Sequence, residues 1–205
     1  MSQSIANQVL AVVHGHGRGW AFSKNDFAGL GSREAIDTAL HRLRKKGTIR
    51  SVLRGIYDYP KRGTLIPGQL GPDIQQVAAA LARKHGWTTE PSGETALNIL
   101  GLSTQVPGRY VFNSDGPNRK YDVGKRAIEF RHRALKDLRA KYPKAALLVH
   151  GLKALGKERV NDELISKLRE RIAPDERKRI LKDIQYATEW VQKAIREACE
   201  EKADA

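Results

Sequence analysis

Basic side chains are concentrated in residues 41–60, HRLRKKGTIRSVLRGIYDYP. Six of these twenty residues are Arg or Lys, and the apolar residues Leu43, Ile49, Val52 and Ile56 recur between them. Guanidinium and ammonium groups bind phosphate oxygens, and arginine also pairs with guanine edges in the major groove of DNA. A segment that combines core residues with so many cations therefore indicates a folded surface that binds nucleic acid.

A second set of side chains suggests phosphodiester hydrolysis. Asp122, Glu129 and Arg131 lie on adjacent expected strands in an order that resembles the D…ExK pattern of metal-dependent nucleases. Such enzymes use carboxylates to hold the cation and usually a lysine to orient water. Arginine is too basic to share a proton at neutral pH, so Arg131 weakens this interpretation. We expect that the protein is not an enzyme, and a metal-dependent nuclease remains an alternative.

Other motifs for catalysis or cofactor binding are missing. The glycines of residues 14–19 fit neither GxGxxG nor GxxxxGK[ST], so we interpret them as a turn. His14 and His16 have no second His or Cys pair at metal-ligand spacing, and the single Cys199 cannot form an internal disulfide. No apolar run reaches the roughly 18 residues of a membrane span. We expect a cytoplasmic protein without a cofactor, a bound metal or a membrane partner.

The net charge of +14 is confined to two segments. Residues 18–62 carry 11 basic and 4 acidic side chains, and residues 107–144 carry the same numbers. Concentrated positive charge attracts polyanions through the release of counterions, without any sequence specificity. The alternative is a solvated basic surface that keeps the protein soluble.

Local signals predict three helices before residue 47. Apolar residues at helical spacing predict the first helix over residues 3–14. Ser23 and Asp26 form a short capping box for a second helix, and Phe22 and Phe27 occupy the positions of a hydrophobic staple. The third helix is expected from about residue 32 to 46, with Gly47 at its C-terminal cap.

A hairpin is predicted directly after the third helix. Residues 48–52 and 56–59 are β-rich, and Gly55 can adopt the positive φ of the turn, which places Arg54 at the tip. Three helices followed by a two-stranded hairpin is the order of a winged helix-turn-helix, whose third helix lies in the major groove while the hairpin reaches the flanking backbone. The fold class that we predict is α+β: an N-terminal winged helix-turn-helix, a small α+β module with an antiparallel sheet, and C-terminal helices.

The candidate DNA-binding residues lie on the third helix and the hairpin. Side chains near the start and middle of the helix are expected to read bases, and cations at its end and on the hairpin to bind phosphates. The first group is Ser32, Arg33, Thr38, His41 and Arg42, and the second is Arg44, Lys45, Lys46, Arg50 and Arg54.

The rest of the chain is predicted to form further domains. A Gly- and Pro-rich segment, residues 61–72, indicates a boundary between a DNA-binding domain (1–62) and an α+β domain (73–150). The second domain is expected to contain helices over 73–86 and 94–100 and strands over 109–113, 119–123 and 126–133. Its sheet would have one buried and one cationic face.

Residues 151–205 read as a C-terminal helical segment. Asn161 is expected to cap one helix, and Pro174 to begin another that continues to the end of the chain. The apolar stripe of this long last helix could pack on the same chain or on a partner, and we favour the same chain. Its members are Ile180, Ile184, Ala187, Val191, Ala194 and Ala198.

Two sequence stretches together resemble a known family. PSGETALNILGLSTQVPGRYVF at residues 91–112, behind RLRKKGTIRSVLRGIYDYP at 42–60, is similar to the AbiEi-type antitoxins of type IV toxin–antitoxin systems over residues 1 to about 150. The resemblance implies a winged-helix domain that represses its own operon by binding operator DNA, and a following domain that counters a nucleotidyltransferase-like toxin. The family's DNA contacts would map onto residues 32–46 and 50–55.

Three functions follow from these observations. The first is a DNA-binding transcriptional repressor that is also an antitoxin in phage defence. The second is the nuclease described above, tethered by a winged helix. The third is an RNA-binding accessory protein of phage defence that uses the same basic surfaces. The operator, the existence of a toxin and the oligomeric state are not specified by the sequence.

Overall fold

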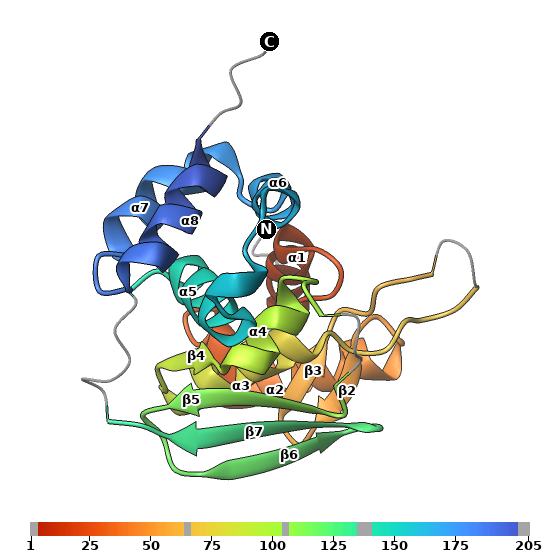
Figure 1. The fold of residues 1–205 in the computed structure, drawn as a ribbon. Coiled ribbons are helices and arrows are strands. Elements are labelled where there is room, and N and C mark those ends of the chain that lie inside the picture. The colour runs from red at the N-terminus through yellow and green to blue at the C-terminus, as the bar shows by residue number, and fades with distance from the viewer. Residues whose placement is uncertain (1–3, 64–66, 104–106, 135–140, 201–205) are drawn as a thin grey trace. The chain divides into compact units, whose positions relative to one another are not determined.

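The computed structural model describes residues 4–63, 67–103, 107–134 and 141–200. Within it the chain divides into two compact units, Met1–Trp87 and Thr88–Ala205, and each has its own helices and its own sheet (Figure 1). The fold class is α+β, as predicted. Residue 3 of the expected first helix and residues 201–205 of the expected C-terminal segment lie outside the described residues.

The first unit begins with α1 (Ile5–His16), β1 (Ala21–Phe22) and the 3₁₀ helix η1 (Lys24–Phe27). α1 continues two residues past the predicted end, because Gly15 stays helical and Gly17, at φ 80°, is its cap. The capping box of η1 is confirmed: the Ser23 amide donates to Asp26 Oδ2 at 2.8 Å. The rings of Phe22 and Phe27 pack edge to face, with centroids 5.3 Å apart.

The remaining elements of the predicted winged helix-turn-helix are α2 (Arg33–Lys45) and the hairpin formed by β2 (Arg50–Leu53) and β3 (Ile56–Asp58). The three strands form an antiparallel sheet in the order β1-β3-β2. Apolar side chains from α1, η1, α2 and β1 share one core, which holds α2 in a fixed relation to the rest of the unit. Its most deeply buried members are Val9, Val13, Phe22, Phe27, Ile36, Leu40 and Ile49.

The helix α3 (Ile74–His85) also belongs to the first unit, where it packs against β1, β3 and η1. The units divide after Trp87, whereas the sequence analysis placed the boundary within residues 61–72 and this helix in the second domain. Glycine and proline mark where regular structure stops. They carry no information about which sheet the next helix covers.

The sheet of the second unit contains β4 (Thr89–Pro91), β5 (Arg109–Ser114), β6 (Arg119–Val123) and β7 (Arg126–His132), in the order β4-β5-β7-β6. The predicted antiparallel pairing is confirmed for β6–β7; β4, which was not predicted, pairs antiparallel with β5, and β5 and β7 are parallel. The turn after β5 therefore skips one strand position. Asn118 in this turn accepts a hydrogen bond from the His132 amide at 2.7 Å, which fixes the turn to the end of β7.

Seven helical segments complete the described part of the second unit, and a common core joins most of them. Because residues on both sides of position 151 share this core, the C-terminal helices are not a separate segment. The segments are α4 (Gly93–Ile99), α5 (Pro143–Leu155), η3 (Lys157–Arg159), α6 (Asp162–Glu170), η4 (Pro174–Glu176), α7 (Arg177–Asp183) and α8 (Glu189–Cys199).

The prediction of one long last helix is wrong, because the helix ends at Asp183 and α8 begins at Glu189. The predicted burial of its apolar stripe within the chain is confirmed, since all six members belong to the common core. The stripe continues through the break because Ile184 and Ala187 face the core from the turn itself.

Close packing of α4 on α5 depends on Gly93. A Cβ atom at this position would lie 2.6 Å from the Ala154 Cβ and 3.3 Å from the His150 carbonyl oxygen. We expect Gly93→Ala to lower the free energy of unfolding by about 1–3 kcal/mol, because the two helices must separate. Urea unfolding measures this change. Gly15→Ala is the control: its Cβ meets open space within a helix, so stability should stay equal or rise.

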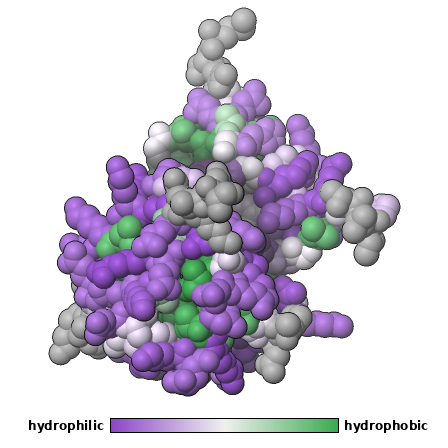
Figure 2. Space-filling model, turned by 45° about the horizontal axis from the view of Figure 1, so that its top comes forward, coloured by the Kyte–Doolittle hydropathy of each residue, from purple (hydrophilic) through white to green (hydrophobic). Residues whose placement is uncertain are grey.

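The surface is mainly polar on the face that Figure 2 shows, where hydrophobic residues appear only in small areas. Large apolar side chains that are exposed include Leu70 and Leu181. Among the described residues, no helix combines the length and the hydrophobicity that crossing a bilayer would require.

Candidate nucleic-acid interface

The start of α2 is fixed by Ser32, whose hydroxyl accepts a hydrogen bond from the Ala35 amide at 3.3 Å. This cap satisfies one of the amides that a helix leaves unpaired at its first turn. Backbone hydrogen bonding, followed by a hydrogen bond with Ser32, lowers the pKa of the exposed Glu34 carboxyl. The exposed face of α2 therefore begins with a carboxylate beside its cations.

The middle of the exposed face of α2 is polar. Ile36, Ala39, Leu40 and Leu43 are buried. At 100° per residue, the opposite side of the helix is occupied by the exposed Thr38, His41 and Lys45. Two of these, Thr38 and His41, were predicted to read bases, and both side chains are exposed.

The edges of this face carry further cations. Arg33 and Arg44 project from one edge of α2, and Arg42 from the other, and all three are exposed. Together with Thr38, Arg42 lines a groove of about 340 Å³ beside the first turn of α1. Lys46 follows the helix as its C-terminal cap and is also exposed.

Arg50 differs from the other candidates because its guanidinium is bound within the unit. Its Nε donates to Asp58 Oδ1 at 3.0 Å, its Nη2 donates to the other carboxylate oxygen, and its Nη1 donates to the Leu70 carbonyl at 2.9 Å. Asp58 lies directly opposite Arg50 in the β2–β3 pair and is only 1% exposed. These contacts give Arg50 a structural role in the wing.

Arg54 lies at the tip of the wing, as predicted, and its side chain is exposed. Gly55 completes the turn with φ 74°, which favours glycine. The Arg54 carbonyl accepts a hydrogen bond from Lys84 Nζ of α3 at 3.1 Å. The tip of the wing is therefore held by a helix that the sequence analysis assigned to another domain.

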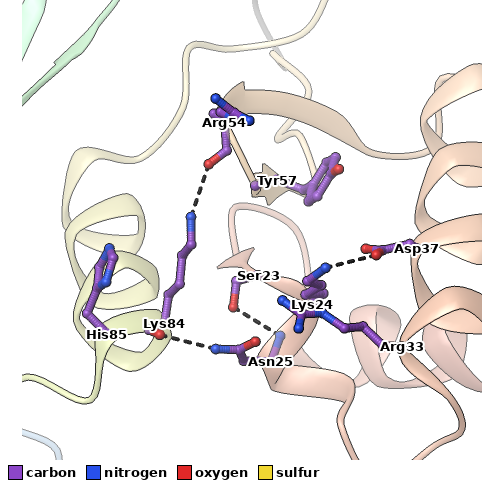
Figure 3. Close-up of a pocket in the computed structure, with 10 residues that line it drawn as sticks. Ser23, Lys24, Asn25, Arg33, Asp37, Arg54, Tyr57, Lys84 and His85 are labelled. Carbon is purple, nitrogen blue, oxygen red and sulfur yellow. Dashed lines mark hydrogen bonds and ion pairs between the residues drawn. The ribbon is translucent and has the colours of Figure 1, made fainter.

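A groove of about 570 Å³ separates the wing tip from the start of α2 (Figure 3). Arg54 and Arg33 line it, together with Lys24 of η1 and Lys84 of α3. One carboxylate, Asp37, is also present, and it forms an ion pair with Lys24 at 2.8 Å. The lining therefore has a clear excess of positive charge and is suited to an anion.

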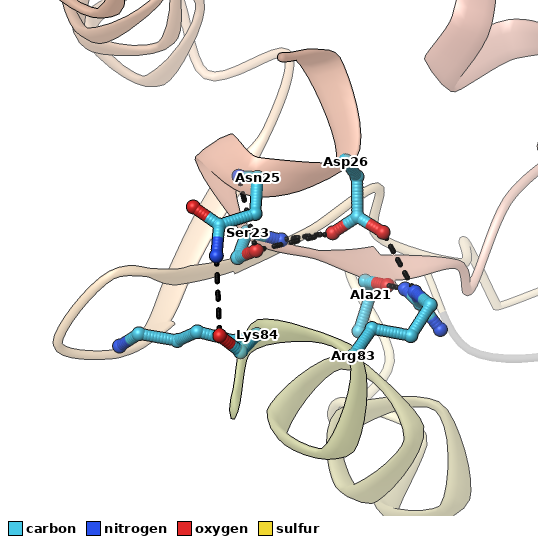
Figure 4. Close-up of polar contacts among 6 residues, drawn as sticks. All are labelled: Ala21, Ser23, Asn25, Asp26, Arg83 and Lys84. Atoms are coloured by element: carbon cyan, nitrogen blue, oxygen red, sulfur yellow. Dashed lines mark hydrogen bonds and ion pairs between the residues drawn. The ribbon is translucent and has the colours of Figure 1, made fainter. Parts of the chain in front are cut away.

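The last turn of α3 is joined to the first unit by several polar contacts (Figure 4). Arg83 Nε donates to Asp26 Oδ1 at 2.6 Å, and its Nη2 donates to the Ala21 carbonyl at 2.8 Å. The Asn25 side chain donates to the Lys84 carbonyl at 3.1 Å. Because Asp26 is also the capping residue of η1, these contacts fix α3 to the elements that carry the groove.

Lys24, Lys84 and His85 also line this groove, and none of them was predicted from the sequence. The only local signal at Lys84 and His85 is that both lie in the basic last turn of α3. Cations are favourable there because they interact with the helix dipole, so this signal does not require a ligand. Their meeting with Arg54 depends on tertiary packing between segments about thirty residues apart.

The carboxylates of the alternative nuclease interpretation are engaged with basic neighbours. Glu129 lies 3.6 Å from both Arg109 and Arg131, and Asp122 lies 3.4 Å from Lys120. In the part of the chain that the structure describes, no three His, Cys, Asp or Glu side chains are grouped so that they could hold a metal ion.

Comparisons with known proteins add a family. No curated protein matches the sequence. Among solved structures, the crystal structure of the RV2827C protein from Mycobacterium tuberculosis is similar, with 15% sequence identity and a TM-score of 0.40 over 97% of this chain and 77% of that chain. The model of DUF6088, described as a family of unknown function, matches residues 8–180. Because this match spans most of the sequence, the chain belongs to the DUF6088 family.

Proposed function

We propose that the protein is a transcriptional repressor whose first unit binds double-stranded operator DNA. The observation that supports this proposal most strongly is the exposed polar face of α2, which carries Thr38, His41 and Lys45 and is flanked by arginines. A helix of this kind, held beside a basic wing by a shared core, matches the docking geometry of winged helices on duplex DNA.

Fluorescence anisotropy with labelled nucleic acids tests the proposal. The protein should bind a duplex from its own upstream region more tightly than a random duplex, and both more tightly than a structured RNA of equal length. Preference for the RNA would instead favour the RNA-binding alternative. Cleavage of DNA that requires a divalent metal and is lost in Asp122→Ala would establish the nuclease.

The antitoxin role is part of the same proposal and rests on the AbiEi-type resemblance of residues 1 to about 150. Its partner would be a nucleotidyltransferase-like toxin encoded in an adjacent reading frame. Expression of that reading frame alone should arrest growth, and expression with this protein should restore it. Growth arrest that this protein does not relieve would contradict the antitoxin role and leave DNA binding unaffected.

Arg42→Ala is expected to weaken binding to the operator by about 1–3 kcal/mol and to weaken binding to random DNA much less, because an arginine that contacts a base edge discriminates between sequences. Anisotropy titrations on both duplexes at one salt concentration measure the difference. Lys46→Ala is the control, because removing a phosphate contact should weaken binding to the operator and to the random duplex equally. Equal losses for Arg42→Ala would assign Arg42 to phosphate.

A further inference from the structure

The groove between the wing tip and α2 has a defined place in the proposed complex, and the inference made here rests on that proposed function. When a helix occupies the major groove and a wing reaches the adjoining minor groove, one sugar–phosphate strand runs between them. In this protein the space between the two elements is the cationic groove of Figure 3. The strand would therefore have to pass along it.

The cations of the groove differ in whether they are already paired. Lys24 is bound to Asp37. Lys84 uses one of its three N–H groups on the Arg54 carbonyl, so two remain for a ligand. Within the described residues, no hydrogen bond or ion pair engages the guanidinium of Arg33 or that of Arg54. Two guanidiniums that have no partner among the described residues and a partly used ammonium therefore line one open space.

We propose that this groove binds the backbone phosphates of the strand between the major and minor grooves, and that α3 is thereby part of the DNA interface. Lys84 would bind a phosphate while it holds the wing tip, so a single side chain both positions Arg54 and adds a contact of its own. Phosphate contacts carry no sequence information. The groove would strengthen binding to all duplexes equally, and Arg33, which the sequence placed among the base-reading residues, would contact a phosphate instead.

The contacts within the first unit support a preformed groove. Arg83 bonds α3 to Asp26 and to the Ala21 carbonyl, and Asn25 bonds η1 to the Lys84 carbonyl (Figure 4). Because these bonds join α3 to β1 and η1 within the first unit, the lysine does not have to be recruited by folding of a loop. A preformed site loses less side-chain entropy on binding.

The test is the salt dependence of binding by the full chain to operator and random duplexes. The slope of log K against log [salt] is negative, and Lys84→Met, Arg33→Ala and Arg54→Ala should each make it shallower by about 0.9, the value for one phosphate contact. Each should reduce affinity by the same factor on both duplexes. Arg62→Ala is the matched control, because Arg62 is an exposed cation of the same unit that does not line the groove. It should leave the slope unchanged.

Two further measurements separate the outcomes. Lys84→Arg keeps the charge, so it should restore the slope that Lys84→Met loses, and failure to do so would overturn the role of Lys84 as a ligand. Inorganic phosphate at constant ionic strength should not compete with DNA, and competition would assign the groove to a free anion. If wild-type protein binds duplex DNA and all three groove variants keep the wild-type slope, the groove does not bind phosphates, but the repressor function stands. If wild-type protein binds no duplex, both proposals are wrong.

Discussion

Replacing Arg50 with methionine is expected to lower the free energy of unfolding of the first unit by about 3–5 kcal/mol. Asp58 is almost fully buried in the central strand of the three-stranded sheet, and both of its carboxylate oxygens accept hydrogen bonds from Arg50. Methionine fills much of the same space but leaves a buried charge without its partner. The desolvation of that carboxylate would then be uncompensated.

Hydrogen exchange of the β3 amides under native conditions measures this loss within the first unit, independently of the second. Arg50→Met combined with Asp58→Leu should recover most of the stability, because a buried ion pair can often be replaced by apolar residues. A loss below about 1 kcal/mol in the single variant would mean that the carboxylate is not effectively buried.

Arg50→Met also tests whether Arg50 has a structural role or contacts DNA, since the sequence predicted Arg50 as a phosphate ligand. Under conditions in which Arg50→Met remains folded, the salt slope for duplex DNA should equal that of wild type, because three of the guanidinium nitrogens are already bound within the unit. A slope that is shallower than that of wild type by about 0.9 would instead show that Arg50 contacts phosphate.

The sequence predicted the winged helix because its signals are local. Ser23 and Asp26 are three residues apart, and Gly55 lies within the hairpin that it turns. Such patterns depend on backbone hydrogen bonds and φ angles over a few residues, so they can be recognised without knowledge of the rest of the fold. The exposed face of α2 follows from helical periodicity in the same way.

The groove could not be predicted because it depends on contacts between distant segments. Arg83 and Asp26 are 57 residues apart, and neither sequence neighbourhood identifies the other as its partner. Arg50 shows the same limit, since periodicity gives its place in a strand but not the burial of Asp58 opposite. The sequence therefore predicts which cations are present and leaves open which are already paired.

The second unit shows two further limits. The apolar stripe from Ile180 to Ala198 is compatible with one helix or with two helices that meet at a turn, because both bury the same residues. The parallel pairing of β5 with β7 depends on the turn between β5 and β6, whose polar contacts extend to His132. Hydrophobic alternation gives the faces of a strand but not its neighbours.

Raising the salt concentration from 50 to 200 mM is expected to weaken binding to duplex DNA by about 10³- to 10⁵-fold, the range for six to ten phosphate contacts. Seven cations are available for such contacts, even with Arg50 and the paired Lys24 set aside: six are exposed on α2, its C-terminal cap or the wing tip, and the half-buried Lys84 lines the groove. They are Arg33, Arg42, Arg44, Lys45, Lys46, Arg54 and Lys84. A slope shallower than about −3 would contradict an extended interface on this unit.

Two triple variants of equal charge change identify which unit causes this dependence. Removing Arg44, Lys45 and Lys46 by alanine substitution should make the negative slope shallower by about 2–3, because all three are exposed at the end of α2. The matched variant replaces Arg109, Lys120 and Arg131, each of which lies within 3.6 Å of a carboxylate of the second unit's sheet. Its slope should change less, because each of these cations has Glu129 or Asp122 beside it, which reduces the local positive charge that DNA would meet. The opposite order of effects would place the DNA on the sheet of the second unit, where the charge imbalance of residues 107–144 is equally large.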